Sequence, residues 1–277
     1  MRHLIVNADD YGVSPGVCAG IRRAHLEGIV TTTTVMMNMP DARHEIDRLR
    51  SETPELGIGV HLNITAGSPL LPRHQVASLV GADGRFLRPE TLLRRVDQVL
   101  PEEVENEWRA QVESLFSAGV RPDHFDSHHH VAYLHPTLLR LFLGLARQYG
   151  CPVRPPLVAD LDHTDILRGI PKDQANWFAE NAPRMLCESK AQHPDRLYAS
   201  FYGQRATLPA LLAILEALPP GSSEIMCHPG QVDDLLRRGS SYIAQRESEL
   251  AILTSPQVRE AVKRDGIQLV RYAGLSA

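Results

Sequence analysis

The sequence has no long apolar run, and its first residues, MRHLIVNADD, carry two acids directly after a short apolar stretch. A membrane-spanning helix needs about 20 consecutive apolar residues, and a secretory signal needs a longer apolar segment than this one. We therefore expect a cytoplasmic protein without a membrane span.

The chain also lacks an excess of either charge. Its 29 basic and 33 acidic residues are interspersed and leave a formal net charge of -4, so no basic stripe is available for nucleic acid. No CxxC spacing occurs among the four cysteines, which argues against a zinc knuckle and against a disulfide framework. These cysteines are Cys18, Cys151, Cys187 and Cys227.

What the sequence does contain is a repeated order of apolar strand and amphipathic helix. Residues 3–8 predict a buried strand, and Ser14 with Pro15 predicts the start of a helix that ends near Gly28. Further strands are predicted at 31–38, 56–64, 124–130, 151–153, 197–203, 223–230 and 267–272. Further helices are predicted at 41–52, 101–118, 135–150, 240–252 and 255–264.

This alternation predicts an α/β fold in which helices surround a parallel sheet. About seven or eight strand-helix units favour a closed or nearly closed (β/α) barrel, with an open doubly wound sheet as the alternative. Because no repeat, low-complexity tract or linker divides the chain, we expect a single domain over residues 1–277. The weakly periodic stretch 65–100 is expected to be a loop over the active face.

Histidines gather where predicted strands end, which is where a parallel barrel carries its chemistry. In the strand 56–64, side-chain alternation directs His61 away from the aliphatic face. The motif HFDSHHH places His124, Asp126, His128 and His130 on one side of an extended chain, with His129 on the other. Imidazole is a common ligand of divalent metals, so a metal site competes here with a hydrogen-bonded interior or a histidine-rich surface loop.

Two adjacent carboxylates, Asp9 and Asp10, follow the first predicted strand in the motif VNADDYG. Alternation directs the two side chains differently, so one can bind a cation while the other accepts a proton nearby. The alternative is a turn or a helix cap, because DDYGVSPG also has the composition of a turn.

Two further residues are candidates for acid/base chemistry. His228 ends the strand EIMCHPG and can donate a proton to a leaving group, or it can be a capping or core histidine. Arg154, in CPVRPP, can hold the basic carboxylate ionised through a bidentate pair, or it can make a surface ion pair.

Seven motifs occur along nearly the whole chain in one order: NADDYG, GIVTTTT, GVHLNIT, DSHHHV, FYG, MCHPG and RESELAILTSP. In this ordered set the chain resembles the YdjC-like carbohydrate deacetylases, the family that includes ChbG-type chitooligosaccharide deacetylases. The resemblance implies a distorted (β/α) barrel, removal of an N-acetyl group from an amino sugar, a divalent metal and a homodimer.

Residue by residue, the resemblance implies that Asp10, His61 and His128 are metal ligands and that Asp9 is the general base. By analogy with the more distant NodB-type polysaccharide deacetylases, His228 would be the general acid and Arg154 would orient Asp9. The chain departs from the family pattern after DSHHHV, where Ala132 replaces the usual histidine. This difference concerns the substrate or the subfamily and leaves the three implied ligands intact.

The predicted function is metal-dependent hydrolysis of the N-acetyl group of an amino sugar or a chitooligosaccharide-like substrate, with release of acetate. A metal-dependent amidohydrolase or phosphoesterase is the first alternative, although the first strand ends in NADD rather than in the HxH pair of amidohydrolases. A non-catalytic sugar-binding protein is the second, and the aromatic content of 5% counts against it. Two imidazoles and a carboxylate favour Zn²⁺, whereas the resemblance suggests Mg²⁺, so both stay open.

Overall fold

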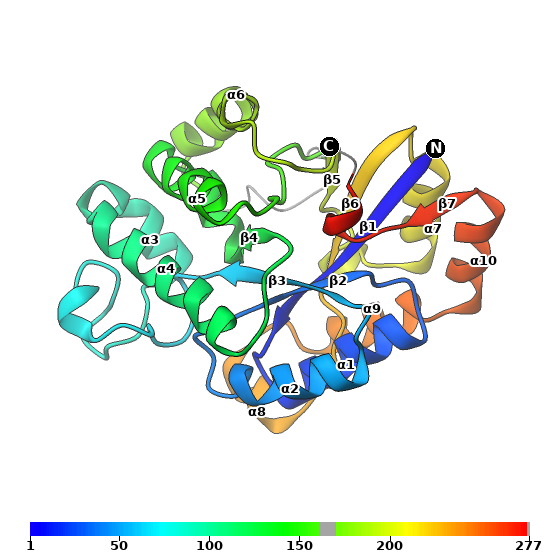
Figure 1. The fold of residues 1–277 in the computed structure, drawn as a ribbon, viewed down its shortest axis with the longest axis horizontal. Helices are drawn as coiled ribbons and strands as arrows, with labels where there is room; N and C mark the ends of the chain where they lie inside the picture. Colours follow the sequence, from blue (N-terminus) through cyan, green and yellow to red (C-terminus); the bar gives the residue numbers. More distant parts are fainter. Residues whose placement is uncertain (161–169, 276–277) are drawn as a thin grey trace.

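The computed structural model describes residues 1–160 and 170–275, which form a curled parallel sheet surrounded by helices (Figure 1). Within these residues the sheet has seven strands in the order β4-β3-β2-β1-β6-β5, and β7 pairs with β1. Every pairing is parallel, which confirms the predicted α/β class. The strands are β1 (Arg2–Tyr11), β2 (Thr32–Val35), β3 (Gly57–Leu62), β4 (Phe125–Ser127), β5 (Arg196–Tyr198), β6 (Gly221–Cys227) and β7 (Ile267–Leu269).

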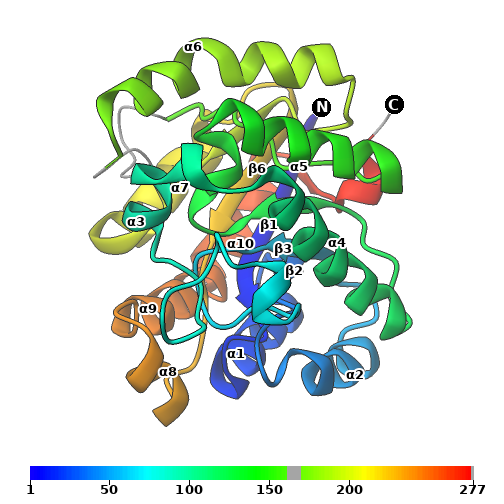
Figure 2. The same ribbon diagram turned by 90° about the vertical axis from the view of Figure 1, so that its left-hand side faces the viewer.

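Helices cover the outside of this sheet. Figure 2 shows α5 and α6 on one side of the strands and α1 and α2 on the other. Each helix among the described residues is too short or too polar to span a lipid bilayer. The α-helices are α1 (Pro15–Leu26), α2 (Ala42–Glu52), α3 (Pro89–Arg94), α4 (Pro101–Ser117), α5 (Pro136–Tyr149), α6 (Lys172–Ser189), α7 (Leu208–Ala217), α8 (Asp234–Gly239), α9 (Ala244–Leu253) and α10 (Pro256–Arg264).

The sheet curls into a distorted barrel, and an extended segment lies between its two edge strands, β4 and β5. Val153 forms a parallel bridge with Phe125 of β4, and Val158 forms one with Leu197 of β5. The predicted strand 151–153 is therefore a single bridge at Val153. This segment also brings Arg154 into the barrel interior, where its side chain is fully buried.

Local sequence explains where the helices begin. Six helices in the described ranges start with proline in the first turn, where the missing N–H costs no hydrogen bond. The side chains of Ser14 and Ser255 accept N–H groups at the starts of α1 and α10. These caps support the predicted helix starts near residues 15 and 255.

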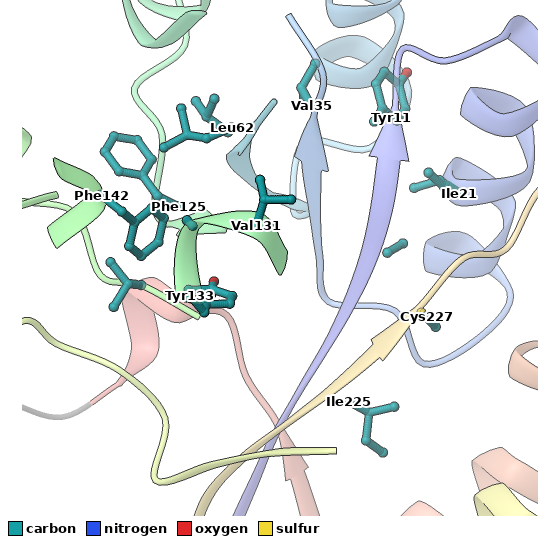
Figure 3. Packing of buried hydrophobic residues seen from close by; sticks show 14 of the residues in the cluster. Tyr11, Ile21, Val35, Leu62, Phe125, Val131, Tyr133, Phe142, Ile225 and Cys227 are labelled. Carbon is teal, nitrogen blue, oxygen red and sulfur yellow. The ribbon is translucent and has the colours of Figure 1, made fainter. Parts of the chain in front are cut away.

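The core fills the space between the curled sheet and the helices. Figure 3 shows Phe125 of β4 beside Val131, Tyr133 and Phe142, while Ile21 of α1 packs near β1. The rings of Tyr133 and Phe142 meet edge to face, with centroids 5.4 Å apart. This packing supports the segment after β4, which carries several of the candidate site residues.

One local prediction is wrong, and another is incomplete. The strand predicted at 124–130 ends at Ser127, and a 3-10 helix, η3 (His128–Tyr133), follows it. The stretch 65–100 is not only a loop, because it contains the short helices η1 (Arg73–Gln75), α3 and η2 (Val96–Gln98). Its apolar side chains join the core, with Leu79, Leu92 and Leu93 all buried.

Candidate active site

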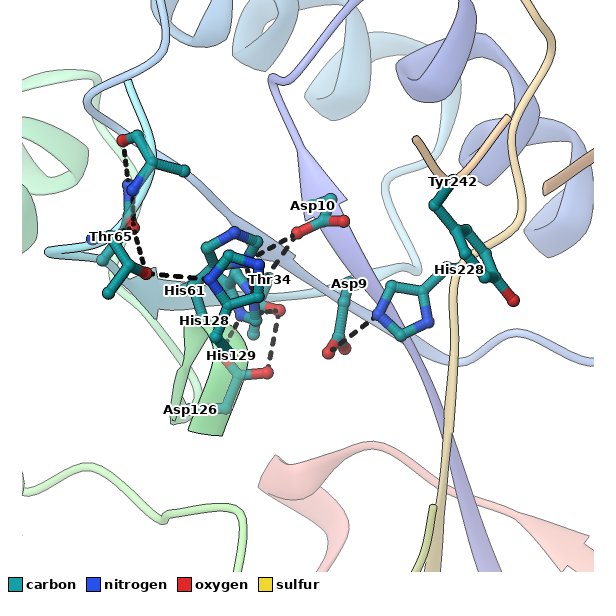
Figure 4. A network of polar contacts seen from close by, with 12 residues as sticks. Asp9, Asp10, Thr34, His61, Thr65, Asp126, His128, His129, His228 and Tyr242 are labelled. Carbon is teal, nitrogen blue, oxygen red and sulfur yellow. Dashed lines mark hydrogen bonds and ion pairs between the residues drawn. The ribbon is translucent and has the colours of Figure 1, made fainter. Parts of the chain in front are cut away.

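The carboxyl ends of the central strands open into a cavity of about 680 Å³. Asp9 and Asp10 come from β1, His61 from β3, and His128 and His228 directly follow β4 and β6. All five residues line the cavity, and Figure 4 shows them converging from these separate strands. The structure therefore brings together residues that lie up to 219 positions apart, as the predicted barrel requires.

Three of these side chains form a triangle of potential ligand atoms. Oδ1 of Asp10 lies 3.4 Å from Nε2 of His61 and 3.2 Å from Nδ1 of His128. The two imidazole nitrogens are 3.1 Å apart. Ligands bound to one Zn²⁺ at about 2.0–2.2 Å are roughly 3–3.5 Å from one another, so the spacing matches a single cation.

The burial of the triangle also supports a site for a single cation. Oδ1 of Asp10 is buried and makes no hydrogen bond within the described part of the chain. A buried carboxylate oxygen that faces two imidazole nitrogens and makes no hydrogen bond is costly, and a cation between the three atoms would satisfy it. The residues present thus fit a divalent metal in number, chemical type and spacing.

The backbone around the triangle adopts uncommon conformations. Asp10, His129 and His130 have φ values of 72°, 53° and 56°, in the left-handed region that non-glycine residues avoid. Such strain costs on the order of 1–3 kcal/mol per residue and concentrates at functional sites. The turn at Asp10 also corrects the expected alternation, because Asp9 and Asp10 both border the same cavity.

A carboxylate behind His61 controls which of its nitrogens faces the triangle. Oδ1 of Asp126 lies 2.6 Å from Nδ1 of His61, so Nδ1 keeps its proton and Nε2 is the nitrogen that would give up a proton to bind a cation. Thr34 donates to the other oxygen of Asp126 at 3.0 Å. Burial lowers the pKa of His61, but Asp126, Asp9 and Asp10 outweigh burial and raise this pKa to about 9.

Asp9 is held by a guanidinium inside the barrel. Arg154 donates to both carboxylate oxygens of Asp9 at 2.7 Å, and Asn7 donates to Oδ1 at 2.8 Å. Burial raises the pKa of Asp9, but Arg154 outweighs burial and holds the pKa well below its usual range. Arg154 also bonds Asp126 and Glu224, so one buried cation is shared by three carboxylates.

His228 lies on one side of Asp9, whereas His61 and His128 lie on the other side (Figure 4). Its Nε2 is 3.8 Å from Oδ2 of Asp9. Burial lowers the pKa of His228 to about 4, against the pull of the nearby carboxylates of Asp9 and Asp10. The imidazole is therefore neutral at pH 7 in the absence of ligands.

The other histidines of the run have different environments. Nδ1 of His129 lies 3.0 Å from the hydroxyl of Thr65, and burial lowers the pKa of His129 to about 2. Burial lowers the pKa of His130 to about 3. His135 caps α5 by accepting the N–H of Thr137. Ala132, which departs from the family pattern, is fully buried and is not among the residues that line the cavity.

Sequence reasoning missed two site residues on helix α9. Arg246 donates from Nη2 to Oδ2 of Asp10 at 2.5 Å, and Glu249 accepts the backbone N–H of His228 at 2.5 Å. Both lie in the motif RESELAILTSP, to which no role was assigned. Their spacing of three residues on a helix places both on one face, and this spacing was the available signal.

Asp126 was also left without a role, although it belongs to the histidine-rich motif. Its position two residues before His128 places it on the same side of the extended strand as that histidine. Metal-binding histidines commonly donate their second N–H to a carboxylate, so this neighbour was a detectable signal.

Comparison with known proteins identifies relatives of the whole chain. The sequence pattern of the YdjC-like proteins matches residues 3–264. A carbohydrate deacetylase of Brevibacillus brevis is 38% identical over 273 residues, covering 98% of this chain and 99% of the relative. One from Geobacillus stearothermophilus is 38% identical over 275 residues, covering 98% of this chain and 97% of the relative.

A solved structure extends the similarity to three dimensions. A protein of Enterococcus faecalis, described as a cellobiose-phosphate cleavage protein, is 35% identical and superposes with a TM-score of 0.85. The match covers 100% of this chain and 99% of that chain.

Proposed function

Because the chain belongs to the YdjC-like family, we propose that it is a metal-dependent carbohydrate deacetylase that releases acetate from an N-acetylated amino sugar. The observation that carries this proposal is the triangle of Asp10, His61 and His128 next to the pair of Asp9 and His228. A cation site beside an ionised carboxylate and an imidazole provides an electrophile, a base and a proton carrier, which together can hydrolyse an unactivated amide.

Asp10, His61 and His128 hold one divalent cation in this proposal. When bound, the cation supplies Lewis acidity, which polarises the acetamide carbonyl and lowers the pKa of an attacking water. Two nitrogen ligands and one oxygen ligand favour Zn²⁺, whereas Mg²⁺, which the sequence resemblance suggests, prefers an all-oxygen shell.

Asp9 accepts the proton of the attacking water. Since Arg154 holds its pKa well below the usual range, Asp9 is ionised at neutral pH. The bidentate pair also fixes the carboxylate in one orientation, with Oδ2 toward His228. This pairing makes Asp9 a weak base. Asp9 can therefore deprotonate only a water whose pKa the cation has lowered.

His228 delivers the proton to the departing amine. Its lowered pKa leaves it neutral at rest, so it first receives the proton that Asp9 has taken from water. Nε2 of His228 and Oδ2 of Asp9 are 3.8 Å apart, which is longer than a hydrogen bond, so one bridging water carries the proton between them. The C–N bond then breaks as nitrogen gains the proton, giving acetate and a free amino sugar.

The substrate class we propose is an N-acetylated hexosamine or a short chitooligosaccharide. A cavity of about 680 Å³ lies within the range of roughly 300–1,000 Å³ that is typical of small-molecule sites. The dimer and the cytoplasmic location stay predictions from the sequence.

Acetate release from a panel of N-acetylated mono- and oligosaccharides tests the proposed function. The enzyme is stripped with a chelator and reloaded in turn with Zn²⁺, Mg²⁺ and Mn²⁺. We expect acetate only after reloading, and no release by His128→Ala at equal protein concentration. His130→Ala provides the matched control in the same histidine run. Full activity of the stripped enzyme, or no acetate from any sugar with any metal, would contradict the proposal.

A further inference from the structure

Two tyrosines form an aromatic wall of the cavity beside His228. The rings of Tyr202 and Tyr242 are stacked almost parallel, with centroids 4.4 Å apart and planes 5° apart. Both tyrosines line the cavity, and 38% of the surface of Tyr202 is exposed. Tyr202 lies in the motif FYG, which the proposed mechanism does not use.

Tyr242 is a rigid support for this wall. Its hydroxyl hydrogen-bonds the buried carboxylate of Glu249 and accepts the N–H of Gly203 at 2.7 Å. The guanidinium carbon of Arg246 lies 5.6 Å from its ring centre. Because Gly203 directly follows Tyr202, the same contacts hold the backbone of Tyr202 against its partner ring.

A second apolar side chain is exposed at the same cavity. Leu235 of α8 lines it with 39% of its surface exposed. Tyr202 and Leu235 thus place two large, partly exposed side chains at the same cavity. Ligand sites are commonly lined by such apolar and aromatic side chains, with a few polar groups that fix the orientation of the ligand.

The position of the wall relative to His228 indicates which part of a substrate meets it. The rings of Tyr202 and His228 meet edge to face, with centroids 5.2 Å apart. In Figure 4, Tyr242 and His228 lie on one side of Asp9, while His61 and His128 lie on the other. A nitrogen that receives a proton from His228 therefore has its carbon substituent on the tyrosine side, and its acetyl group on the side of the triangle.

We propose that Tyr202, supported by Tyr242, forms the subsite for the pyranose ring that carries the scissile acetamide. A pyranose presents C–H groups on its faces, and stacking one face on an aromatic ring removes apolar surface from water. The inference rests on the proposed deacetylase function and adds that Tyr202 selects a sugar ring over an acyclic amine.

Two amides of different shape test this subsite. The trifluoroacetamides of glucosamine and of ethanolamine share an activated acyl group, and only the first contains a pyranose. Trifluoroacetate release is followed by fluorine NMR for the metal-loaded enzyme, Tyr202→Ala and Tyr202→Phe. We expect Tyr202→Ala to raise KM for the glucosamine amide roughly tenfold, with little change in kcat. A tenfold change corresponds to the loss of about 50–60 Å² of apolar contact between the ring and the sugar.

Several outcomes distinguish a sugar-binding role of Tyr202 from a purely structural one. Tyr202→Phe keeps the flat ring and should therefore have the same KM as the parent. Neither variant should change turnover of the ethanolamine amide. Phe116→Ala is the matched control, because Phe116 is 37% exposed, stacks on Tyr149 and does not line the cavity. An unchanged KM in Tyr202→Ala, or equal losses on both amides, would overturn the subsite.

Two further outcomes distinguish a folding defect of the variant, and a wrong proposed function, from a wrong subsite. If Tyr202→Ala does not fold, Tyr202→Leu retains apolar bulk but lacks the flat face that covers a pyranose, so it should show a smaller rise in KM than the one expected for alanine. A parent KM in Tyr202→Leu would then overturn the proposal. If the unsubstituted enzyme cleaves neither amide and no N-acetyl sugar, the proposed function fails, and the subsite fails with it.

Discussion

Arg246 donates to Oδ2 of Asp10 although 236 positions separate the two residues. The other oxygen of Asp10 faces His61 and His128, so the guanidinium orients the carboxylate toward the triangle. Glu249, one turn further along α9, accepts the backbone N–H of His228. One helix near the end of the chain therefore positions a proposed metal ligand and the proposed acid.

Arg246→Met should weaken metal binding while the fold is retained. Methionine occupies a similar volume but cannot donate to Asp10, and loss of such a supporting contact typically costs about 10–100-fold in metal affinity or activity. Competition with a chromophoric chelator measures the affinity. Arg238→Met, which changes an exposed arginine of α8, serves as the control and should bind metal like the parent. Equal affinities in all three proteins would show that Arg246 does not orient Asp10.

Asp126→Asn should also reduce metal affinity, again by about 10–100-fold, because the carboxylate that fixes the His61 tautomer is lost. The chain contains a matched pair outside the site, where Asp123 lies 2.5 Å from Nδ1 of His124. Asp123→Asn should leave the affinity unchanged in the same titration. If both variants lose metal equally, general destabilisation rather than the tautomer of His61 explains the effect.

Asp9→Asn should keep the metal and lose activity. The amide preserves the shape of the side chain but cannot take a proton from water, and loss of a general base commonly lowers the rate by about 10²–10⁴-fold. Metal content per chain and acetate release are measured on the same preparation. A variant that loses its metal together with its activity would identify Asp9 as a ligand or a structural residue.

Glu249→Gln should flatten the pH dependence of stability. Burial raises the pKa of Glu249 to about 7 from a usual value of 4.5, so the folded chain holds this proton more tightly than the unfolded chain. Its stabilising contribution is complete below pH 4.5 and is lost as the pH rises through about 7. Each pKa unit of difference corresponds to about 1.4 kcal/mol, and glutamine does not titrate.

Urea unfolding between pH 5 and 8 measures this effect for the parent and for Glu249→Gln. The variant should gain stability relative to the parent as the pH rises. Glu247→Gln replaces an exposed carboxylate of the same helix and is the control. Parallel curves for the parent and Glu249→Gln would show that Glu249 does not hold a proton in the folded chain.

The sequence allowed the barrel class to be predicted because its strands alternate with helices and end in polar side chains. The approach of Asp9, Asp10, His61, His128 and His228 to one cavity follows from that topology, since parallel strands end at one edge. Their roles as ligands, base and acid remain predictions that the experiments above test.

Local patterns misled where their signal was weak. Helix α6 was missed because only Phe178, Ala182 and Leu186 are buried on it, and Pro183 interrupts its pattern. The run His128–His130 was predicted to continue the strand, yet His129 and His130 adopt left-handed conformations that a run of histidines does not predict. The contact of Arg246 with Asp10 depends on tertiary packing across most of the chain, which no local pattern encodes.

The most direct test of the proposed centre is anomalous diffraction from crystals loaded with Zn²⁺ or Mn²⁺. We expect one strong peak per chain, at about 2.0–2.2 Å from Oδ1 of Asp10, Nε2 of His61 and Nδ1 of His128. A peak held instead by Asp9, His61 and Asp126, the other cluster of potential ligands within the described residues, would contradict this assignment. So would the absence of any peak in crystals of an enzyme that releases acetate.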